Sequence, residues 1–201
     1  MMKKEDIAMP NDATKDVAVN RLGKLNLGCG NKKVPGYINV DNNPNCKPDV
    51  IVDLDGGLTQ FQDDSMDEIR AEHVLEHVDD LLLVLNEMYR VSKDGAIWVI
   101  QVPHFSYGFV HPFHKRGFSY GTFDWFFSKS SPEHYGNLGL SVMEIRFNYT
   151  RFQSRFIRLV VAPINIIANL HKGLCERVWC YWVGGFEEIQ YKIRVDKHPV
   201  I

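Results

Sequence analysis

The chain has 201 residues, of which 45% are hydrophobic and 24% charged, and its formal net charge is −2. This length fits one domain of ordinary size with a packed core. The composition excludes a disordered, collagen-like or coiled-coil protein. The near balance of charge lacks the electrostatic footprint of a general polyanion binder, so we do not expect bulk nucleic acid as a partner.

The cysteines point to a reducing compartment. No pair among them has CxxC or zinc-ribbon spacing; they are Cys29, Cys46, Cys175 and Cys180. We therefore predict free thiols, no metal site and a cytoplasmic location. Residues 1–20 lack the apolar core of a signal peptide. The longest apolar run, Leu159–Leu170, is shorter than the roughly 20 residues that a transmembrane helix needs.

Short apolar segments alternate with loops or a helix over the first hundred residues. The predicted strands are 24–27, 37–41, 49–53, 67–71 and 96–102. Apolar residues at helical spacing predict a helix over 78–91, which Lys93-Asp94-Gly95 closes with a left-handed glycine cap. This alternation predicts an α/β fold, a Rossmann-like three-layer sandwich with a mostly parallel sheet and an antiparallel C-terminal strand.

The second half has a different pattern. Residues 104–136 combine aromatic, histidine and glycine residues without aliphatic periodicity, which is typical of a substrate-side lid or insertion. Further elements follow in order: strands over 140–148 and 155–161, a helix over 163–182 and an alternating strand over 187–195. We predict one domain over 22–201, preceded by a lead-in over 1–21 that is either disordered or a helix covering the site.

Ligands of parallel sheets bind at the carboxyl ends of the strands. The residues that follow the predicted strands are all glycine or polar: Gly28, Gly30, Asp41, Asp53, Glu72, His73 and His104. The first strand enters a Gly-x-Gly turn, but Lys33 stands where a dinucleotide fingerprint has its third glycine. Asp41 ends the next strand, where a carboxylate can accept two hydrogen bonds from a ribose diol. Together with Asp53, it favours a nucleotide-type ligand over a purely structural turn.

These motifs resemble those of the class I S-adenosylmethionine-dependent methyltransferases, over about residues 22–104. Leu27-Gly28-Cys29-Gly30 matches the glycine-rich motif, Asp41 the acid that holds the ribose hydroxyls, and Asp53-Leu54 the pair beside the adenine. The resemblance implies S-adenosylmethionine as cofactor and methyl transfer as reaction. The cofactor contacts that it implies are Asn26, Leu27, Gly28, Cys29, Gly30, Asp41, Asn42, Asp53, Leu54, Glu72 and His73.

A second stretch, His111–Arg116 with Phe118–Tyr120, resembles a subgroup of small bacterial methyltransferases, some of them associated with surface glycans. The near-neutral charge disfavours bulk nucleic acid as the methyl acceptor and leaves a small molecule, a glycan or a lipid-type compound. One feature departs from the family. Only residues 31–36 separate the first turn from the second strand, whereas a parallel crossover needs about a dozen residues. We expect either a first helix cut down to a turn or a plain loop there.

A sulfonium methyl group is already activated, so the enzyme has mainly to align donor and acceptor and exclude water. A general base is needed only for an acceptor that loses a proton. Our candidates at the carboxyl edge are His73, His104 and Glu72. The substrate-binding candidates are His104, Tyr107, His111 and His114.

Several alternatives remain open. Taken singly, each histidine of the loop is better explained as a packed ring in an aromatic cluster than as a site residue. The aromatic residues of 105–126 suit pocket walls or a homodimer contact, and residues 156–182 suit core packing more than a membrane surface. His73-Val74-Leu75-Glu76-His77 also has the inverzincin pattern of zinc peptidases, which would leave the Gly-x-Gly turn unexplained. A nucleotide-binding module without catalysis is the other alternative.

Overall fold

The computed structural model describes residues 23–108, 110–124, 138–150, 155–182 and 184–197. The predicted lead-in over 1–21 lies outside these residues, as does the last part of the predicted lid, 125–136. The strands are β1 (Lys24–Leu27), β2 (Ile38–Asp41), β3 (Val50–Ile51), β4 (Met66–Glu72), β5 (Ser92–Pro103), β6 (Leu140–Asn148) and β7 (Glu188–Val195). The helices are α2 (Leu81–Val91), α3 (Phe105–Gly108), α6 (Arg155–Leu170), α7 (Lys172–Leu174) and α8 (Cys180–Trp182). Shorter turns are η1 (Pro44–Cys46), η2 (Leu54–Gly56) and the π-helical η3 (Cys175–Trp179).

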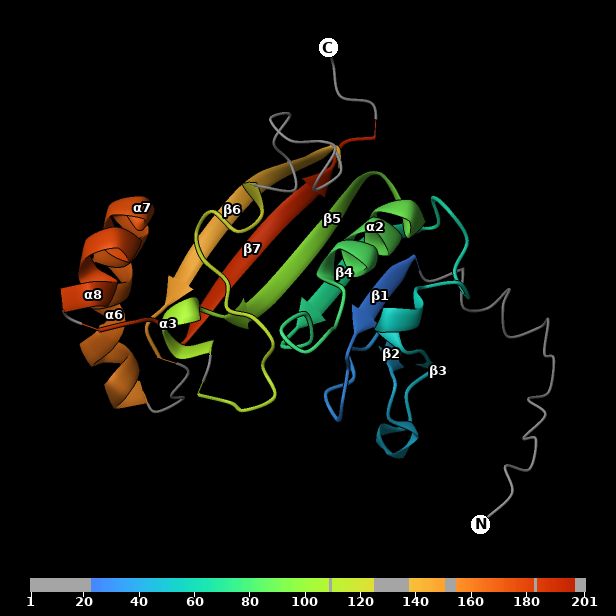
Figure 1. Cartoon of the computed structure of the whole chain (residues 1–201), viewed down its shortest axis with the longest axis horizontal. Coiled ribbons are helices and arrows are strands. Elements are labelled where there is room, and N and C mark those ends of the chain that lie inside the picture. Colours follow the sequence, from blue (N-terminus) through green and yellow to red (C-terminus); the bar gives the residue numbers. More distant parts are fainter. Residues whose placement is uncertain (1–22, 109, 125–137, 151–154, 183, 198–201) are drawn as a thin grey trace.

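The strands form a seven-stranded sheet of order β3-β2-β1-β4-β5-β7-β6 (Figure 1). The pairs from β3 through β5 are parallel, and β7 runs antiparallel to both β5 and β6. This confirms the Rossmann-like class with a mostly parallel sheet and an antiparallel C-terminal strand. The carboxyl ends of β1, β2 and β4 therefore meet at one edge of the sheet, where ligands bind in such folds.

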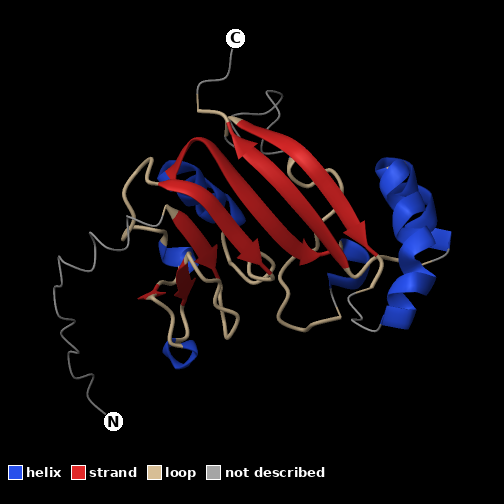
Figure 2. Cartoon of the chain, turned by 180° about the vertical axis from the view of Figure 1, so that it is seen from behind, coloured by secondary structure: helices blue, strands red, loops and turns tan. Residues whose placement is uncertain are grey.

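Helix α2 lies against one face of the sheet and behind the strands in Figure 2. Its buried side consists of Val84, Leu85, Met88 and Val91, which is the helical spacing that the sequence shows. The helix ends at Val91, and Ser92 caps it with a hydroxyl that donates to Met88 O at 2.6 Å and accepts from Trp98 Nε1 at 2.9 Å. The prediction that Gly95 forms the cap is wrong. Gly95 has a φ of 79° in an irregular stretch of β5, where the pairing with β4 shifts register.

The short connection between β1 and β2 contains turns and no helix. Side chains take over the hydrogen bonds that a crossover helix would satisfy internally. Buried Asn26 donates to Asn39 Oδ1 at 3.0 Å, and the same oxygen accepts from Val34 N at 2.8 Å. Asn39 Nδ2 in turn donates to Asp49 Oδ2 at 2.8 Å. The connection thus consists of turns in place of a crossover helix, which corresponds to the cut-down form of the sequence analysis.

The region after β6 corrects another prediction. Residues 155–161 belong to α6 rather than to a strand. The apolar residues recur at helical intervals across Pro163, which the sequence analysis took as a boundary; they are Phe156, Leu159, Val160, Ile166, Ile167 and Leu170. The helical segments continue to Trp182, as predicted from Pro163 onward.

Two asparagines attach α6 to the edge strand β6. Asn169 Oδ1 accepts from Phe147 N at 2.9 Å and Asn169 Nδ2 donates to Phe147 O at 3.0 Å. Asn165 Oδ1 accepts from Tyr149 N at 2.9 Å. These amides pair the backbone next to the open side of β6, which covers a sheet edge that would otherwise be exposed. The polar side of α6 therefore faces the protein.

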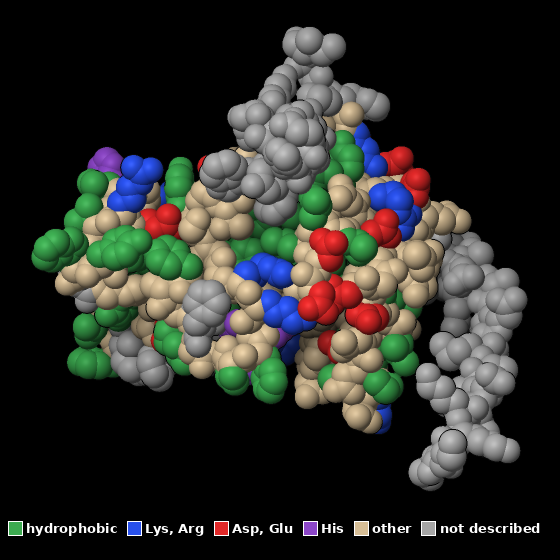
Figure 3. Space-filling model, viewed as in Figure 1, with side chains coloured by type: hydrophobic (Ala, Val, Ile, Leu, Met, Phe, Trp, Pro, Cys, Tyr) green, Lys and Arg blue, Asp and Glu red, His purple; other side chains and the backbone are tan. Residues whose placement is uncertain are grey.

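The apolar side of α6 and its neighbours faces outward. Ten large apolar residues in α6–α8 are 48–84% exposed: Phe156, Leu159, Val160, Ile166, Ile167, Leu170, Leu174, Val178, Tyr181 and Trp182. Figure 3 shows green side chains gathered over this end of the molecule. The interpretation of these residues as core packing is wrong for this face. No described helix is both long and apolar enough to cross a membrane.

Candidate functional site

A cavity of about 270 Å³ lies at the carboxyl ends of β1, β2 and β4. Predicted residues and their neighbours, both apolar and polar, line it: Gly28, Val40, Asp41, Asn42, Val52, Asp53, Leu54, Asp55, His73, Val74, His77 and Val78. Six of the predicted site residues are thus brought together: Gly28, Asp41, Asn42, Asp53, Leu54 and His73. The volume is close to the lower end of the range of about 300–1,000 Å³ that is usual for small-molecule sites.

Gly28 must be glycine for two reasons. Its φ is 62°, a left-handed conformation that side chains disfavour. A Cβ atom built on it would lie 2.5 Å from Val74 Cβ. The glycine therefore lets the end of β1 approach the turn after β4, which closes one wall of the cavity. At Gly30, by contrast, a Cβ would meet no atom within 4 Å, although its φ of 48° is also left-handed.

The carboxylate of Asp41 is fixed by backbone donors. Gly30 N–H donates to Asp41 Oδ2 at 2.7 Å, and Asn43 N–H donates to Asp41 Oδ1 at 2.9 Å. Each oxygen retains a lone pair for a further donor, because a carboxylate oxygen accepts two hydrogen bonds. The oriented carboxylate beside the cavity fits a diol such as that of a ribose.

The floor of the cavity is apolar, and a second acid organises it. Leu54, Val52 and Val78 are at most 8% exposed, which suits a flat heteroaromatic ring. Asp53 caps η2 by accepting from Asp55 N at 3.2 Å, and Asp55 Oδ1 accepts from the N–H groups of Asp79 and Asp80 at 2.7 and 3.1 Å. Asp55 is not among the residues predicted from the sequence. There, only its place directly after the Asp53-Leu54 pair indicates a role at the site.

His73 lies where β4 ends, with a φ of 53°. Its N–H donates to Gln101 O at 2.8 Å, which ties the residue to β5. The ring lies between two carboxylates, with Nδ1 at 3.2 Å from Glu76 Oε1 and Nε2 at 3.1 Å from Glu188 Oε2. The ring is therefore held from both sides at the wall of the cavity.

Glu188 is a buried acid that the sequence analysis did not select. It is 2% exposed, and Asn148 Nδ2 donates to it at 2.6 Å, as does the amide of Gln101. Burial alone raises the pKa of Glu188, but the hydrogen bonds from His73, Gln101 and Asn148 outweigh burial and lower it. In the sequence, Glu188 is marked only as an acid at the start of a strand in which polar and apolar residues alternate.

Five predicted cofactor residues do not line this cavity: Asn26, Leu27, Cys29, Gly30 and Glu72. Asn26 holds the short connection, and Leu27 is fully buried in the core. Glu72, the last residue of β4, pairs with Arg70. Burial raises the pKa of the Cys29 thiol, which keeps it protonated.

His104 lies in a packed aromatic cluster rather than at the cavity. It is 0% exposed, and its ring centre is 4.4 Å from that of Phe105 and 5.6 Å from that of Phe186. Its Nδ1 contacts Ser106 Oγ at 2.7 Å and its Nε2 contacts Glu176 Oε1 at 3.1 Å. The packed-ring alternative therefore describes His104, which joins β5 to η3.

The other residues of the predicted lid separate into core and surface. Phe118 and Phe123 are buried, whereas Tyr107 is 45% and Phe113 is 74% exposed. Tyr107 lines a separate hollow beside Phe186.

His111 and His114 instead meet His77, with ring centres 5.7 and 4.8 Å from it. Burial lowers the pKa of His77, and the nearby His114 and His111 lower it further against the opposing effect of Glu76.

The inverzincin pattern does not form its metal site here. Residues 73–80 are turns without a helix, so His73 and His77 do not share a helical face. His73 is instead engaged by Glu76 and Glu188. This arrangement contradicts the peptidase alternative.

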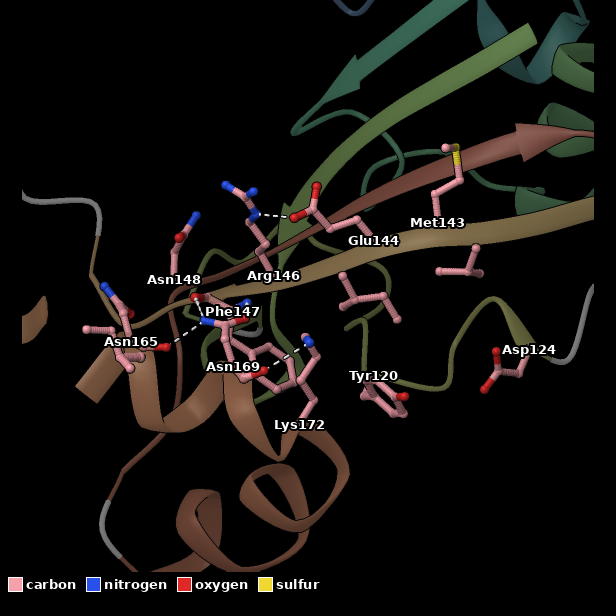
Figure 4. A pocket seen from close by; sticks show the side chains of 13 residues that line it. Tyr120, Asp124, Met143, Glu144, Arg146, Phe147, Asn148, Asn165, Asn169 and Lys172 are labelled. Carbon is pink, nitrogen blue, oxygen red and sulfur yellow. Dashed lines mark hydrogen bonds and ion pairs between the residues drawn. The ribbon is translucent and has the colours of Figure 1, made fainter. Parts of the chain in front are cut away.

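A larger hollow, of about 740 Å³, lies between β6 and α6 (Figure 4). Tyr120, Arg146, Asn169 and Lys172 are among its lining residues. The cavity reaches to His73 at the end of β4, and from β4 to β6 the sheet spans three strand spacings, or about 14 Å. Because reacting atoms must approach to about 3–3.5 Å, this hollow is too far from the first cavity to hold the reacting part of a shared substrate.

Comparison with known proteins points to one kind of domain. Residues 25–100 match the family model described as "Methyltransferase domain". A SAM-dependent methyltransferase from Archaeoglobus fulgidus has a similar structure, with a TM-score of 0.53 and 19% identity over 85% of both chains. Another, from Mesorhizobium loti, has a TM-score of 0.53 and 13% identity, and the match covers 85% of this chain and 90% of that one. At these identities the structures establish a shared fold. No curated protein sequence matches the chain.

Proposed function

We propose that this chain is a class I S-adenosylmethionine-dependent methyltransferase and that it binds S-adenosylmethionine in the cavity at the ends of β1, β2 and β4; its fold and the match of residues 25–100 to a methyltransferase domain support this. The observation that carries this proposal is the carboxylate of Asp41, which two backbone N–H groups orient beside the open space next to Gly30. A disordered or solvated acid would not present fixed acceptors to a ribose.

Different lining residues would contact different parts of the cofactor. Asp41 would hold the ribose hydroxyls, and Leu54 with Val52 and Val78 would pack against the adenine. The turn at Gly28–Gly30 would leave room for the methionine portion, because glycine lets the backbone approach a ligand closely. When bound, the cofactor supplies a methyl group on a sulfonium sulfur.

His73 is the predicted catalytic residue that remains a candidate, because Glu72 and His104 do not line the cavity. We assign His73 to contact with the methyl acceptor at the cavity wall. Its orientation depends on Glu76 and Glu188, which hold its two ring nitrogens. The main task of these residues is to position the acceptor and keep water out.

The test of cofactor binding is calorimetric titration with S-adenosylmethionine and S-adenosylhomocysteine. We expect saturable binding of both compounds and a rise in melting temperature. Absence of heat and of any thermal shift at millimolar ligand would contradict the proposal and favour a fold that has lost its ligand. For His73, the conservative variant His73→Asn suits the left-handed backbone. It should lower turnover while leaving cofactor affinity within twofold.

Among small-molecule, glycan and lipid-type acceptors, the outward apolar side of α6–α8 favours a lipid-type acceptor at a membrane surface. This segment carries Arg155, Arg158, Lys172 and Arg177 and a single acid, Glu176, which is turned inward to His104. Net positive charge beside exposed leucine, isoleucine and tryptophan is typical of an interfacial segment that binds anionic lipid. A homodimer through the same face is the competing outcome.

The remaining partner and location proposals follow from charge and thiols. The net charge of −2 disfavours bulk nucleic acid as the acceptor. All four cysteines are free, which is the state expected in a reducing cytoplasm. Mass spectrometry of the native protein should find four unmodified thiols, and a disulfide would contradict the location.

A further inference from the structure

Histidines surround a buried carboxylate next to the cavity. Glu76 is 0% exposed and lies in the turn between β4 and α2, directly before His77. The segment after α3 folds back over this turn and brings His114 to His77 and His111 to His114, with ring centres 4.8 and 4.7 Å apart. Residues distant in the sequence therefore form one cluster.

Hydrogen bonds to backbone carbonyl groups of the turn join it to the segment. Lys115 N–H donates to Glu76 O at 2.8 Å, and Arg116 Nη1 donates to Leu75 O at 2.9 Å. These bonds fix the spacing between Glu76 and His114 without using either side chain. The side chains of the cluster are thus preorganised by the fold.

One carboxylate oxygen of Glu76 has no hydrogen-bond partner among the described residues. Its Oε1 faces His73 Nδ1 at 3.2 Å and His114 Nε2 at 4.0 Å. Its Oε2 is buried and accepts no hydrogen bond from the residues that the structure describes. A buried carboxylate oxygen without a partner is costly, and in proteins such a group is normally paired with a cation or coordinates a metal.

The imidazole of His77, next to Glu76, has a ring nitrogen that can bind a metal ion. His77 Nδ1 lies 3.3 Å from Phe113 O, and because a carbonyl oxygen only accepts, Nδ1 carries the proton. A neutral ring then presents an unprotonated Nε2. An imidazole whose second nitrogen donates to a backbone carbonyl is the usual arrangement of a metal-binding histidine.

We propose that Glu76, His77 and His114 bind one divalent transition-metal ion at the rim of the cavity, and that zinc is the ion their donor set favours. Their ligand atoms lie within 4.8 Å of one another. In a tetrahedral site with metal–ligand bonds of about 2.1 Å, two ligand atoms lie about 3.4 Å apart, so the widest pair has to close by up to about 1.4 Å. Two imidazoles with one carboxylate suit zinc or iron(II), whereas magnesium and calcium prefer oxygen ligands.

This site differs from both sequence-based expectations. No metal site is expected from the sequence, because the cysteines lack metal-ligand spacing and the inverzincin pattern leaves the Gly-x-Gly turn unexplained. In the inverzincin pattern His73 and His77 would both bind zinc and Glu76 would be the base. Here His73 Nε2 instead contacts Glu188. Three protein ligands leave a coordination position for water or for an oxygen of a bound molecule.

The experiment measures metal binding alone, without S-adenosylmethionine. Protein stripped with a chelator and dialysed is titrated with zinc chloride in competition with a chromophoric chelator, and bound metal is counted by elemental analysis. We expect one equivalent of zinc and a raised melting temperature. His114→Ala should weaken binding at least tenfold, whereas the control His171→Ala, at an exposed histidine beside α7, should bind as the unchanged protein does.

Glu76→Gln provides a second variant of nearly the same shape, in case His114→Ala does not fold. It should also lose at least tenfold in affinity, because an amide is a poor replacement for a carboxylate ligand. Equal zinc affinity in the unchanged protein and in both folded variants would overturn the proposal, as would magnesium chloride binding with the affinity of zinc. Because no cofactor is present, failure of S-adenosylmethionine binding would leave these results unaffected.

Discussion

The two ends of the sheet are built in opposite ways. At the ends of β1, β2 and β4, polar side chains point into a cavity and are fixed by backbone donors, as Asp41 is by Gly30 and Asn43. At the β6 end, the asparagines of α6 face inward to the strand while its leucines and isoleucines face outward. The first arrangement presents oriented hydrogen-bond partners to a small ligand. The second presents apolar surface, which requires a large partner.

Gly28→Ala should give the largest effect of any single substitution at the cavity end. The added Cβ would lie 2.5 Å from Val74 Cβ, in a left-handed backbone. We expect a loss of about 2–4 kcal/mol in the free energy of unfolding, from overpacking together with the strained backbone. Urea denaturation measures it.

Gly30→Ala is the matched control, since its Cβ would meet no atom within 4 Å. It should cost only the backbone strain, about 1–2 kcal/mol. Equal losses in the two variants would show that Val74 yields easily and that the approach of β1 to the turn after β4 is not tightly determined.

Asp41→Ala should come next, with an effect on ligand affinity. Removing the oriented carboxylate is expected to weaken S-adenosylmethionine binding by about 1–3 kcal/mol, the range for hydrogen bonds to a charged group. Calorimetry of the folded variant measures this. Glu144→Gln, on the exposed side of β6, removes a charge far from the cavity and should leave the affinity unchanged. A similar loss in both variants would mean that overall charge, rather than contact, is responsible.

Much of the cavity end could be predicted from the sequence because each residue follows directly from a local pattern. Asp41 is the last residue of β2 and His73 follows the last residue of β4, and the parallel sheet brings the ends of these strands together. Glu188 and His114 could not be placed in this way, since their positions depend on pairings between β5 and β7 and on a loop folding back. Glu72 was placed by its position at the strand end alone, but successive side chains of a strand alternate between faces, and that of Glu72 pairs with Arg70 instead of lining the cavity.

The β6 end could not be predicted for a different reason. The spacing of Phe156, Leu159 and Val160 is compatible with a helix, but an apolar helix face is normally read as buried. What reverses the orientation of α6 is hydrogen bonding by Asn165 and Asn169 to the backbone of β6, which sequence periodicity does not reveal. In the sequence, only the asparagines within the apolar run indicate this orientation of α6.

Acidification should destabilise the cavity half through Glu87. Hydrogen bonds from Arg90 lower the pKa of Glu87 below its usual 4.5, with a further contribution from the N–H of Leu58 and against the opposing effect of burial. A lowered folded-state pKa means that this stability is present above pH 4.5 and is lost as the pH falls through the folded value. Glu87→Gln should therefore lower the free energy of unfolding at pH 7 by about 1–2 kcal/mol and reduce its fall between pH 5 and about pH 3. An unchanged pH profile in urea melts would contradict this assignment.

Leu159→Glu should have the smallest effect on the isolated protein, because Leu159 is 78% exposed and touches little. We expect a change below about 0.5 kcal/mol in the free energy of unfolding, and unaltered S-adenosylmethionine affinity. Flotation with vesicles containing anionic phosphatidylglycerol should nevertheless fall at least fivefold, since a carboxylate replaces buried apolar contact in the interfacial layer. Glu144→Gln serves again as the control and should float like the unchanged protein. If the unchanged protein does not float but elutes as a dimer that Leu159→Glu dissociates, the outward face of α6–α8 binds a second copy instead of a membrane.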